Sequence, residues 1–390
     1  MVGVLWSLTG LALLIWVGML VFWGQFWRAD QRLVNQTLAE PALWPRVTVL
    51  IPARNEAELI GQSLRSHLTQ DYPGQWSVVL VDDQSDDGTA AIATQTATDL
   101  ERSNQLTILT GTALPKGWAG KLWAMQQGFQ HLQRQPAPPD YVLFTDADIA
   151  HAADNLRQLV TKAEAEKLDL VSLMVRLRCQ SFWEKLLIPA FIFFFQMLYP
   201  FSWVNNPRKG TAAAAGGCAL IRFSALQRIH GLEQIRQALI DDCALGAAVK
   251  ADGPIWLGLS SDTLSLRPYP DLTSIWNMVT RSAYTQLNYS PWLLIGTLLG
   301  MALVYLVAPL SFVLGLVWGV PGLALTGLAT WVLMALAYWP TLRLYDGGLL
   351  LALALPLIAF LYTLMTLDSA RRHWVGQGGA WKGRVYSDVG

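Results

Sequence analysis

The chain has 390 residues, of which 53% are hydrophobic and only 14% are charged. A composition this apolar is unusual for a water-soluble protein and indicates that part of the chain lies in lipid. The 28 basic and 28 acidic residues cancel to a formal net charge of zero, which favours neither a nucleic-acid partner nor a generally acidic ligand. Cys179, Cys218 and Cys243 lack the spacing of a zinc or redox site, so we predict reduced thiols.

The first predicted element is an apolar run from about Val4 to Gly24. A run of roughly 20 apolar residues can cross a bilayer core of about 30 Å as a helix. No basic residue precedes it and no small-residue cleavage site follows, so we predict an uncleaved transmembrane anchor over residues 1–27. Arg28 and Arg32 follow directly, and the positive-inside bias then places the next segment in the cytoplasm.

An α/β domain is predicted over residues 45–268, because short β-branched runs alternate with helical patterns. Strands that alternate with helices favour a parallel sheet, which binds its ligand at the carboxyl ends of the strands. Polar turns follow three of the predicted strands: Pro52–Glu56 after Val47–Ile51, Asp82–Thr89 after Ser77–Val81, and Asp146–Asp148 after Tyr141–Thr145. We therefore expect these three turns to converge on one crevice.

Asp146 and Asp148, two residues apart on an extended turn, are suited to hold a hard divalent cation and leave sites for phosphate oxygens. Such a cation would stabilise the charge that develops when a sugar leaves a diphosphate. A solvated turn is the simpler interpretation of this pair alone, but its place after a buried strand favours the metal. Lys121, in the glycine-flanked segment Lys116–Ala124, could approach a phosphate closely, or it could be an ordinary solvated lysine.

The segment Phe182–Val204 is apolar enough to span a membrane, but it contains two prolines and several polar residues. If it crossed, the acidic motifs on either side of it would lie on opposite faces of the membrane. We therefore predict a helix at the headgroup level or a re-entrant helix, beside the place where a lipid acceptor would arrive. Residues 269–290, with the run Leu272–Tyr289, form a second predicted interfacial segment.

A transmembrane bundle is predicted over residues 291–368, followed by a basic tail at residues 369–390. Pro291–Pro340 predicts two spans with a break near Gly319–Gly322, and Gly348–Leu367 predicts a third. With the anchor, these spans would put the tail outside, whereas its four basic residues favour the inside. Either one apolar run is re-entrant or the tail breaks the rule; the basic residues are Arg371, Arg372, Lys382 and Arg384.

Over roughly Arg46–Leu266 the chain resembles glycosyltransferase family 2, whose members have a GT-A nucleotide-sugar-binding fold. Six elements occur in the family's order. They are Pro52–Glu56, Val81–Thr89, Gly120-Lys121 with Ala124, Asp146–Asp148, Gly216–Leu220 and Asp241–Gly246. The resemblance implies an α/β domain of the Rossmann-like GT-A class together with α-helical transmembrane segments.

The resemblance also implies roles for individual residues. Asp242, or its neighbour Asp241 where the family usually has Glu, would be the catalytic base of an inverting transfer. Asp146 and Asp148 would bind Mg²⁺ or Mn²⁺, and Asp83 would contact the nucleoside. The other implied donor-site residues are Pro52, Ala53, Arg54, Glu56, Ser85, Lys121 and Arg281, and the implied acceptor-side residues are Gly216, Gly217 and Cys218.

One departure concerns the Q-x-x-R-W element of processive members, because the segment Trp276–Ser282 keeps only Arg281. The anchor, the cytoplasmic domain and the carboxy-terminal bundle look most like the ceramide glucosyltransferase-like branch. Two stretches, from Trp276 to Leu287 and from Gly378 to Tyr386, are similar to hopene-associated glycosyltransferases. This implies an integral protein of the bacterial cytoplasmic membrane that glycosylates a hopanoid or another isoprenoid or sphingolipid-like lipid from a nucleotide sugar, with UDP-sugars as the expected donors. A polyisoprenyl phosphate acceptor and an inactive membrane scaffold are the alternatives; donor sugar and oligomeric state stay open.

Overall fold

The computed structural model describes residues 2–33, 38–376, 380–381 and 384–385. The chain forms two compact units, each assembled from separate stretches of sequence. We call them the helical unit (Met1–Ala29, Cys179–Ser202 and Tyr269–Gly379) and the sheet unit (Asp30–Arg178, Trp203–Pro268 and Ala380–Gly390). The segment Cys179–Ser202 therefore interrupts the predicted α/β domain and packs with the helices.

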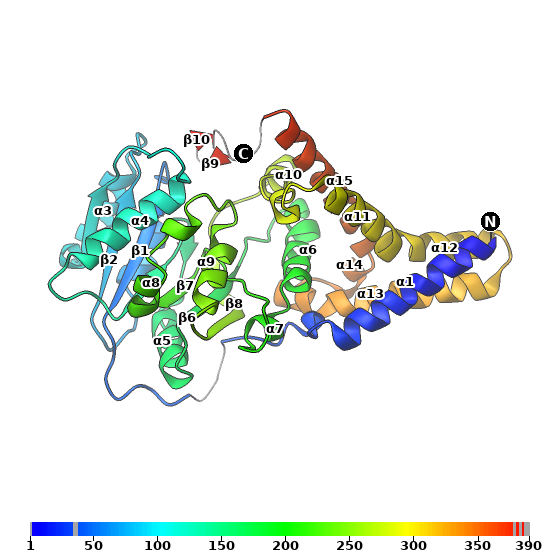
Figure 1. Ribbon diagram of the computed structural model, residues 1–390, viewed down its shortest axis with the longest axis horizontal. Coiled ribbons are helices and arrows are strands. Elements are labelled where there is room, and N and C mark those ends of the chain that lie inside the picture. Colours follow the sequence, from blue (N-terminus) through cyan, green and yellow to red (C-terminus); the bar gives the residue numbers. More distant parts are fainter. Residues whose placement is uncertain (1, 34–37, 377–379, 382–383, 386–390) are drawn as a thin grey trace. The chain divides into compact units, whose positions relative to one another are not determined.

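The sheet unit is built on an eight-stranded sheet with the strand order β3-β2-β1-β4-β7-β6-β8-β5 (Figure 1). Its strands are β1 (Val47–Ala53), β2 (Trp76–Asp82), β3 (Leu106–Thr110), β4 (Tyr141–Phe144), β5 (Ile149–Ala150), β6 (Leu170–Arg176), β7 (Ala219–Arg222) and β8 (Ile255–Ser265). A separate pair, β9 (Ala380–Trp381) and β10 (Arg384–Val385), is antiparallel. Lys382 and most of the predicted tail motif lie outside the described residues.

The expectation of a parallel sheet is correct for β3, β2, β1 and β4 but wrong for the whole sheet. Strand β7 runs antiparallel to β4, with Phe144 opposite Ala219, and β5 runs antiparallel to β8. Because β7 begins at the edge where β4 ends, the glycine loop that precedes it lies beside the loop that follows β4. The reversal of one strand thus brings Gly216 to the same edge as Asp146.

Helices cover both faces of this sheet, as the fully buried pattern of β1 requires. Val49 and Ile51 belong to the core cluster that contains Ile60, whereas Leu50 points toward the other face. There a Cβ on Gly128 would lie 2.4 Å from Leu50 Cδ1, so the helix that carries this glycine packs very closely on the strand. The helices are α2 (Ile60–Leu68), α3 (Thr89–Asp99), α4 (Gly120–Gln133), α5 (Asn155–Ala165), α8 (Phe223–Arg228) and α9 (Asp241–Lys250), with short 3₁₀ turns at Ser103–Gln105 and Glu233–Ile235.

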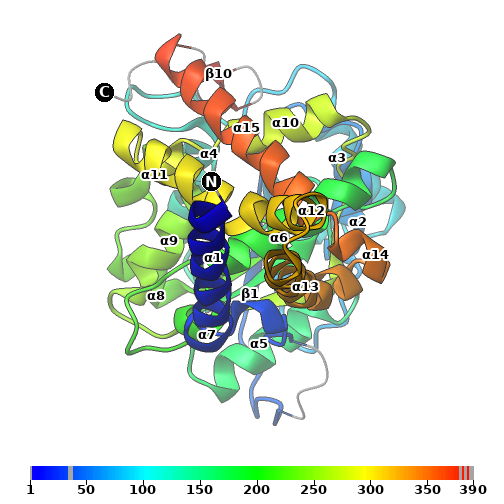
Figure 2. The ribbon, with the colours of Figure 1, turned by 90° about the vertical axis from the view of Figure 1, so that its right-hand side faces the viewer.

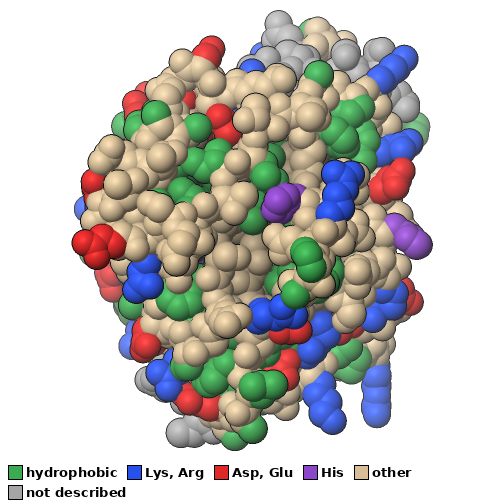
Figure 3. Space-filling view, turned by 90° about the vertical axis from the view of Figure 1, so that its left-hand side faces the viewer, with side chains coloured by type: hydrophobic (Ala, Val, Ile, Leu, Met, Phe, Trp, Pro, Cys, Tyr) green, Lys and Arg blue, Asp and Glu red, His purple; other side chains and the backbone are tan. Residues whose placement is uncertain are grey.

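The one face of the molecule that Figure 3 shows mixes Lys and Arg side chains with Asp and Glu, and its apolar side chains are scattered. This is the pattern of an ordinary water-facing surface. It contrasts with the helical unit, where many large apolar side chains are exposed, among them Leu14, Phe22, Trp292 and Leu350.

The helical unit contains α1 and α13 side by side, with α12 against both (Figures 1 and 2). Polar contacts join α1 to α12 and to the turn that precedes α12: the hydroxyls of Thr9 and Ser311 lie 2.6 Å apart, and Trp16 Nε1 donates to the carbonyl of Val304 at 2.8 Å. The helices are α1 (Val2–Phe22), α6 (Phe182–Leu198), α10 (Leu272–Thr280), α11 (Pro291–Met301), α12 (Val307–Val317), α13 (Pro321–Leu344), α14 (Leu349–Ala352) and α15 (Leu355–Trp374). A π-helical turn at Ala302–Leu306 joins α11 to α12, α7 (Phe201–Val204) lies where the two units meet in sequence, and 3₁₀ turns lie at Phe26–Arg28 and Thr285–Leu287.

Three helices are long and apolar enough to cross a bilayer: Val2–Phe22, Pro291–Val317 and Pro321–Leu344, with mean hydropathies of 2.2, 2.3 and 1.5. The predicted span at residues 348–367 is not one helix, because the chain turns between α14 and α15 and Pro356 lies in the first turn of the second helix. Within the described residues, α15 is not among the candidate spans, and it carries Asp368, Arg371 and Arg372 near its end.

Helix α6 occupies the segment predicted to be interfacial, and it begins with a capping box in which Ser181 and Glu184 exchange hydrogen bonds. The Glu184 carboxylate is fully buried, and it also accepts the N–H of Tyr269 at 2.8 Å. Farther along, Gln196 Nε2 donates to the Thr341 hydroxyl of α13 at 3.1 Å. These contacts hold α6 to segments that follow it in the chain by more than eighty residues.

Candidate active site

The ends of β1 and β2 bring the first two predicted turns together. The N–H of Asp83 donates to the carbonyl of Ala53 at 2.8 Å, and Arg54 Nη1 donates to the carbonyl of Asp83 at 2.5 Å. The Asp83 carboxylate is fully buried, 3.8 Å from the same guanidinium. The Ser85 hydroxyl accepts the N–H of Asn55 at 3.0 Å. Pro52 and Ala53 are the last residues of β1, so the predicted nucleotide-binding turns are neighbours in space.

A charged cluster joins the other four predicted motifs at the carboxyl edge of the sheet. Lys121 Nζ lies 2.8 Å from Asp146 Oδ1 and 3.0 Å from Asp241 Oδ2, and the N–H of Gly216 donates to Asp242 Oδ2 at 3.0 Å. A Cβ on Gly216 would lie 3.0 Å from Lys121 Nζ, so a larger residue there would push the ammonium group away by a few tenths of an ångström. Lys121 is the second residue of α4, so the start of this helix positions its side chain. Strand β4 ends two residues before Asp146.

The two carboxylates of Asp241 and Asp242 lie in the first turn of α9. Negative side chains are favoured there, because the unpaired N–H groups of a helix start carry partial positive charge. The backbone N–H of Cys243 donates to Asp242 Oδ1 at 2.8 Å, so both oxygens of Asp242 accept from the backbone. This fixes the orientation of Asp242.

Burial and charge set the acidity of this cluster. Burial, with the neighbouring charge of Asp241, raises the pKa of Asp242 to about 6, although Lys121 acts in the opposite sense. Burial also raises the pKa of Asp146, against the effect of Lys121. Burial alone would lower the pKa of Lys121, but the charges of Asp146 and Asp241 raise it above its ordinary value. The lysine is therefore a permanent cation, and Asp242 is a stronger base than a solvated aspartate.

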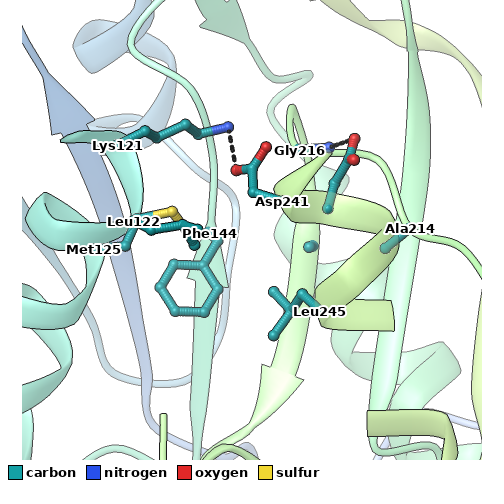
Figure 4. A pocket seen from close by; sticks show the side chains of 10 residues that line it. Lys121, Leu122, Met125, Phe144, Ala214, Gly216, Asp241 and Leu245 are labelled. Atoms are coloured by element: carbon teal, nitrogen blue, oxygen red, sulfur yellow. Dashed lines mark hydrogen bonds and ion pairs between the residues drawn. The ribbon is translucent and has the colours of Figure 1, made fainter. Parts of the chain in front are cut away.

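A small pocket lies against this cluster (Figure 4). Figure 4 shows the charged side chains of Lys121 and Asp241 on one side of it and the apolar groups of Phe144 and Leu245 on the other. Its lining residues are Lys121, Leu122, Met125, Phe144, Ala214, Gly216, Ala219, Asp241, Asp242 and Leu245.

Asp148 contacts a residue that the sequence analysis did not single out, Arg267. Arg267 Nε lies 2.5 Å from Asp148 Oδ2, and Arg267 Nη2 lies 2.9 Å from both carboxylate oxygens of Glu56. Arg267 and Asp148 are separated by 119 positions, and they meet because β5 pairs with β8. No local pattern could have indicated this pair; the only available signal was a lone arginine near the end of the predicted α/β domain.

The donor chemistry of the site fits a hard divalent cation, although the described residues contain no group of three or more His, Cys, Asp or Glu with the geometry of a metal site. Asp146 and Asp148 would supply carboxylate oxygens as ligands, and one oxygen of each contacts a cationic side chain. Five carboxylates gather around two cationic side chains, which leaves negative charge for a cation to neutralise; they are Glu56, Asp146, Asp148, Asp241 and Asp242, with Lys121 and Arg267.

Within the described part of the chain, three further predicted site residues are not members of the charged cluster around Lys121. Gly217 packs near Val175, and Cys218 is buried in the core, where burial raises the pKa of its thiol to about 12. Of the predicted acceptor-side loop, Gly216 is the member beside the charged cluster. Arg281 follows α10 in the helical unit, and its role at the diphosphate stays a prediction.

Comparison with known proteins gives the site its context. Residues 48–230 match the family model of Glycosyl transferase family 2. A beta-monoglucosyldiacylglycerol synthase of Trichormus variabilis is 29% identical over 144 residues, which are 36% of this chain and 29% of that protein. The chain thus spans under a third of the length of this curated relative.

Among solved structures, the mannosyltransferase PcManGT from Pyrobaculum calidifontis, in complex with GDP-Man and Mn²⁺, superposes with a TM-score of 0.55 at 20% sequence identity. The alignment covers 96% of this chain and 98% of that one. The fold is therefore a GT-A-like α/β fold, as predicted, with three apolar helices that could span a membrane.

Proposed function

We propose, starting from the Glycosyl transferase family 2 domain at residues 48–230, that this chain is a membrane-bound inverting glycosyltransferase. It transfers a sugar from a nucleotide-sugar donor, a UDP-sugar in the first instance, to the hydroxyl group of a lipid. The acceptor class is a hopanoid or another isoprenoid or sphingolipid-like lipid. The sheet unit works on the cytoplasmic face of the bacterial cytoplasmic membrane.

The observation that carries this proposal is the convergence of Lys121, Asp146 and Asp242 at the start of the Gly216 loop. These three side chains and the glycine loop come from four separate stretches of sequence, and a fold has no structural need to gather so many carboxylates at one edge. Buried carboxylates with a raised pKa, in a pocket beside a permanent cation, are typical of a catalytic site.

Asp242 is the general base of the reaction. Its carboxylate accepts the proton of the acceptor hydroxyl while that oxygen bonds to the anomeric carbon of the sugar. The bond from this carbon to the diphosphate oxygen breaks on the opposite side, so the configuration inverts and a nucleoside diphosphate leaves. One proton is transferred to Asp242 in each turnover and is later released to water.

Lys121 supplies positive charge at the point where the leaving diphosphate gains negative charge. Its ammonium group is held by Asp146 and Asp241, and both contacts keep it at the edge where the glycine loop begins. Asp146 and Asp148 would hold Mg²⁺ or Mn²⁺, which supplies further charge neutralisation when bound. Asp83 and Arg54 lie at the ends of the neighbouring strands and would bind the nucleoside.

A lipid acceptor is supported by the three apolar helices. It is also supported by the Trichormus variabilis relative, which is named as the synthase of a glucosylated diacylglycerol, a lipid. A polyisoprenyl phosphate is the second candidate acceptor, because Arg208 and Lys209 are exposed in the sheet unit just after α7. The ammonium of Lys209 lies 5.4 Å from the ring of Trp203, which leaves the basic pair less suited to bind a phosphate than two unengaged side chains would be.

The test is calorimetry of the detergent-purified protein with a panel of nucleotide sugars, with and without Mn²⁺. Wild type should bind one donor tightly and only with metal, and Asp148→Ala should lose that binding. Asp242→Asn should bind the same donor normally but transfer no sugar to lipid acceptors followed by mass spectrometry. A protein that binds no donor under any condition would instead be an inactive scaffold.

A further inference from the structure

We propose that Arg267 is a positioning residue of the donor site, which fixes the carboxylate of Asp148 so that Asp148 Oδ1 is directed to a divalent cation. This inference rests on the proposed function, since it assigns a role within the same site.

The contact between Arg267 and Asp148 is reinforced by the backbone. The N–H of Leu266, the residue before Arg267, donates to the carbonyl of Asp148 at 2.8 Å. The next two residues after Asp148 form β5, where Ile149 pairs with Ser265 and Ala150 with Leu264. Main chain and side chain of the β8 end therefore both hold the Asp148 loop in one register.

The guanidinium of Arg267 connects two loops with different proposed roles. Its Nε group donates to one oxygen of Asp148, and its Nη2 group lies 2.9 Å from both oxygens of Glu56 in the turn after β1. Strands β1 and β4 are parallel neighbours, with Leu50 opposite Phe144, so their following loops lie at the same edge. Arg267 thus ties the first nucleotide-binding turn to the metal motif.

Burial makes this network different from a surface ion pair. The side chains of Asp148 and Glu56 are only 13% and 11% exposed, and that of Arg267 is 32% exposed. Exposed ion pairs contribute little to stability and hold their partners loosely, whereas an arginine that forks between two largely buried carboxylates fixes them in direction. A lysine could preserve the charge at this position, but it could not reach both carboxylates with the same planar geometry.

The two oxygens of Asp148 are therefore unequal. Oδ2 contacts Arg267, while Oδ1 makes no contact with a cationic side chain among the described residues. Hydrogen bonds to one oxygen of a metal-binding carboxylate are known to orient the other toward the metal, and their loss weakens metal binding about 10- to 100-fold. Lys121 cannot substitute, because its contacts are with Asp146 and Asp241.

The experiment measures the binding of Mn²⁺ alone, in the absence of donor, by the loss of the electron paramagnetic resonance signal of free Mn²⁺. The variants are Arg267→Lys, Arg267→Gln and Asp148→Ala. The matched control is Arg222→Lys, because Arg222 is also 32% exposed and also bridges two carboxylates, Glu164 and Asp169, but it lies at the opposite end of β4.

We expect Arg267→Lys and Arg267→Gln to bind Mn²⁺ about 10- to 100-fold more weakly than wild type. Arg222→Lys should bind it as wild type does. Thermal unfolding is measured in parallel, and Arg267→Lys should lose no more thermal stability than the control. If Arg267→Gln does not fold, the lysine variant carries the test.

The possible failures are distinguishable. Should Arg267→Lys bind Mn²⁺ as tightly as wild type while Asp148→Ala loses it, the positioning role of Arg267 is overturned and the proposed metal site stands. Should wild type itself bind no Mn²⁺, the metal role of Asp146 and Asp148 falls, and the inference falls with it.

Discussion

At the scale of single residues, burial and the neighbouring charge of Asp241 set the basicity of the Asp242 carboxylate. Burial first and the charge of Asp241 second raise the pKa of Asp242 to about 6. A base must be ionised to accept a proton, so turnover should rise as the pH rises through about 6 and level off above it. The Asp241→Asn variant removes one cause of the raised pKa and should move this ascending limb to lower pH.

The measurement is the pH dependence of kcat/KM for the wild type and for Asp241→Asn. Asp252→Asn, which changes an exposed aspartate just after α9, is the control and should leave the profile unchanged. An ascending limb at the same pH in wild type and Asp241→Asn would contradict the assignment of Asp242 as the titrating base.

His67 makes a prediction about stability in acid. Its ring is fully buried against the ring of His151, with centroids 4.4 Å apart, and neither of its nitrogens has a hydrogen-bond partner among the described residues. Burial lowers the pKa of His67 to about 3, below the ordinary value of 6.5, so the unfolded chain binds the proton more readily. The free energy of unfolding therefore falls as the pH falls below about 6.5, by about 1.4 kcal/mol per pH unit for one proton.

The His67→Phe variant should lose less stability than wild type between pH 7 and pH 5. Thermal unfolding across this range is the measurement, and His131→Gln, on the half-buried part of α4, is the matched control. An identical acid dependence in wild type and His67→Phe would show that other groups govern acid unfolding.

Much of the candidate site was predictable from the sequence, because several of its charged residues come directly after predicted strands or lie in recognisable motifs. Asp146, Lys121 and Asp242 were named from motifs, and the structure brings Asp146 and Asp242 to the same lysine and glycine loop. Arg267 was not named from a motif, because its partner Asp148 is 119 positions away and a single arginine forms no recognisable pattern. Cys218 was named from a motif, but its side chain faces the core, which a motif does not reveal.

At the scale of elements, the direction of a strand is what the sequence failed to predict. Alternating strands and helices correctly indicated β1, β2 and β4, whose apolar runs each lead into a polar turn. Strand β7 has four residues, as β4 does, but the helix that follows it has only six residues and does not mark a parallel crossover. Its antiparallel pairing depends on how the preceding loop enters the sheet, and this is a property of tertiary packing.

The pairing of α12 and α13 depends on small residues. A Cβ on Gly327 would lie 2.6 Å from the backbone nitrogen of Phe312 and 2.7 Å from the carbonyl oxygen of Ala308. Helices that pack in lipid gain their attraction from such close backbone approach. The Gly327→Leu variant must separate the two helices, and we expect it to lower stability by about 1–3 kcal/mol.

Thermal unfolding of the detergent-purified protein measures this effect. Gly300→Leu in α11 is the matched control, because no atom lies within 4 Å of a Cβ built there. Equal midpoints for the two leucine variants would mean that α12 and α13 do not need this contact.

At the scale of the whole molecule, the number of spans determines the side on which the chain ends. Three crossings, by α1, by α11 with α12, and by α13, would return the chain to the side of the sheet unit. Arg371 and Arg372 at the end of α15 would then lie on the cytoplasmic side, as the positive-inside bias favours. Three spans thus avoid the conflict that four spans created.

Cysteine labelling in intact cells tests this topology, with the three native cysteines replaced by alanine. Trp318→Cys, in the turn between α12 and α13, should react with a membrane-impermeant maleimide from outside. Val375→Cys, just after α15, should react only after the cells are permeabilised. Labelling of Val375→Cys in intact cells would mean that α15 is a fourth span.

The hydrogen bond from Gln196 in α6 to Thr341 in α13 also bears on how the protein is made. The two residues are 145 positions apart, so at about 5 to 20 residues per second the ribosome needs roughly 7 to 29 s to reach Thr341 after Gln196. Throughout that interval α6 is complete while its partner on α13 does not yet exist. Translation order alone therefore prevents the helical unit from reaching its final packing before the last quarter of the chain is synthesised, and a nonsense codon ahead of α13 would leave a finished α6 with its apolar side chains exposed.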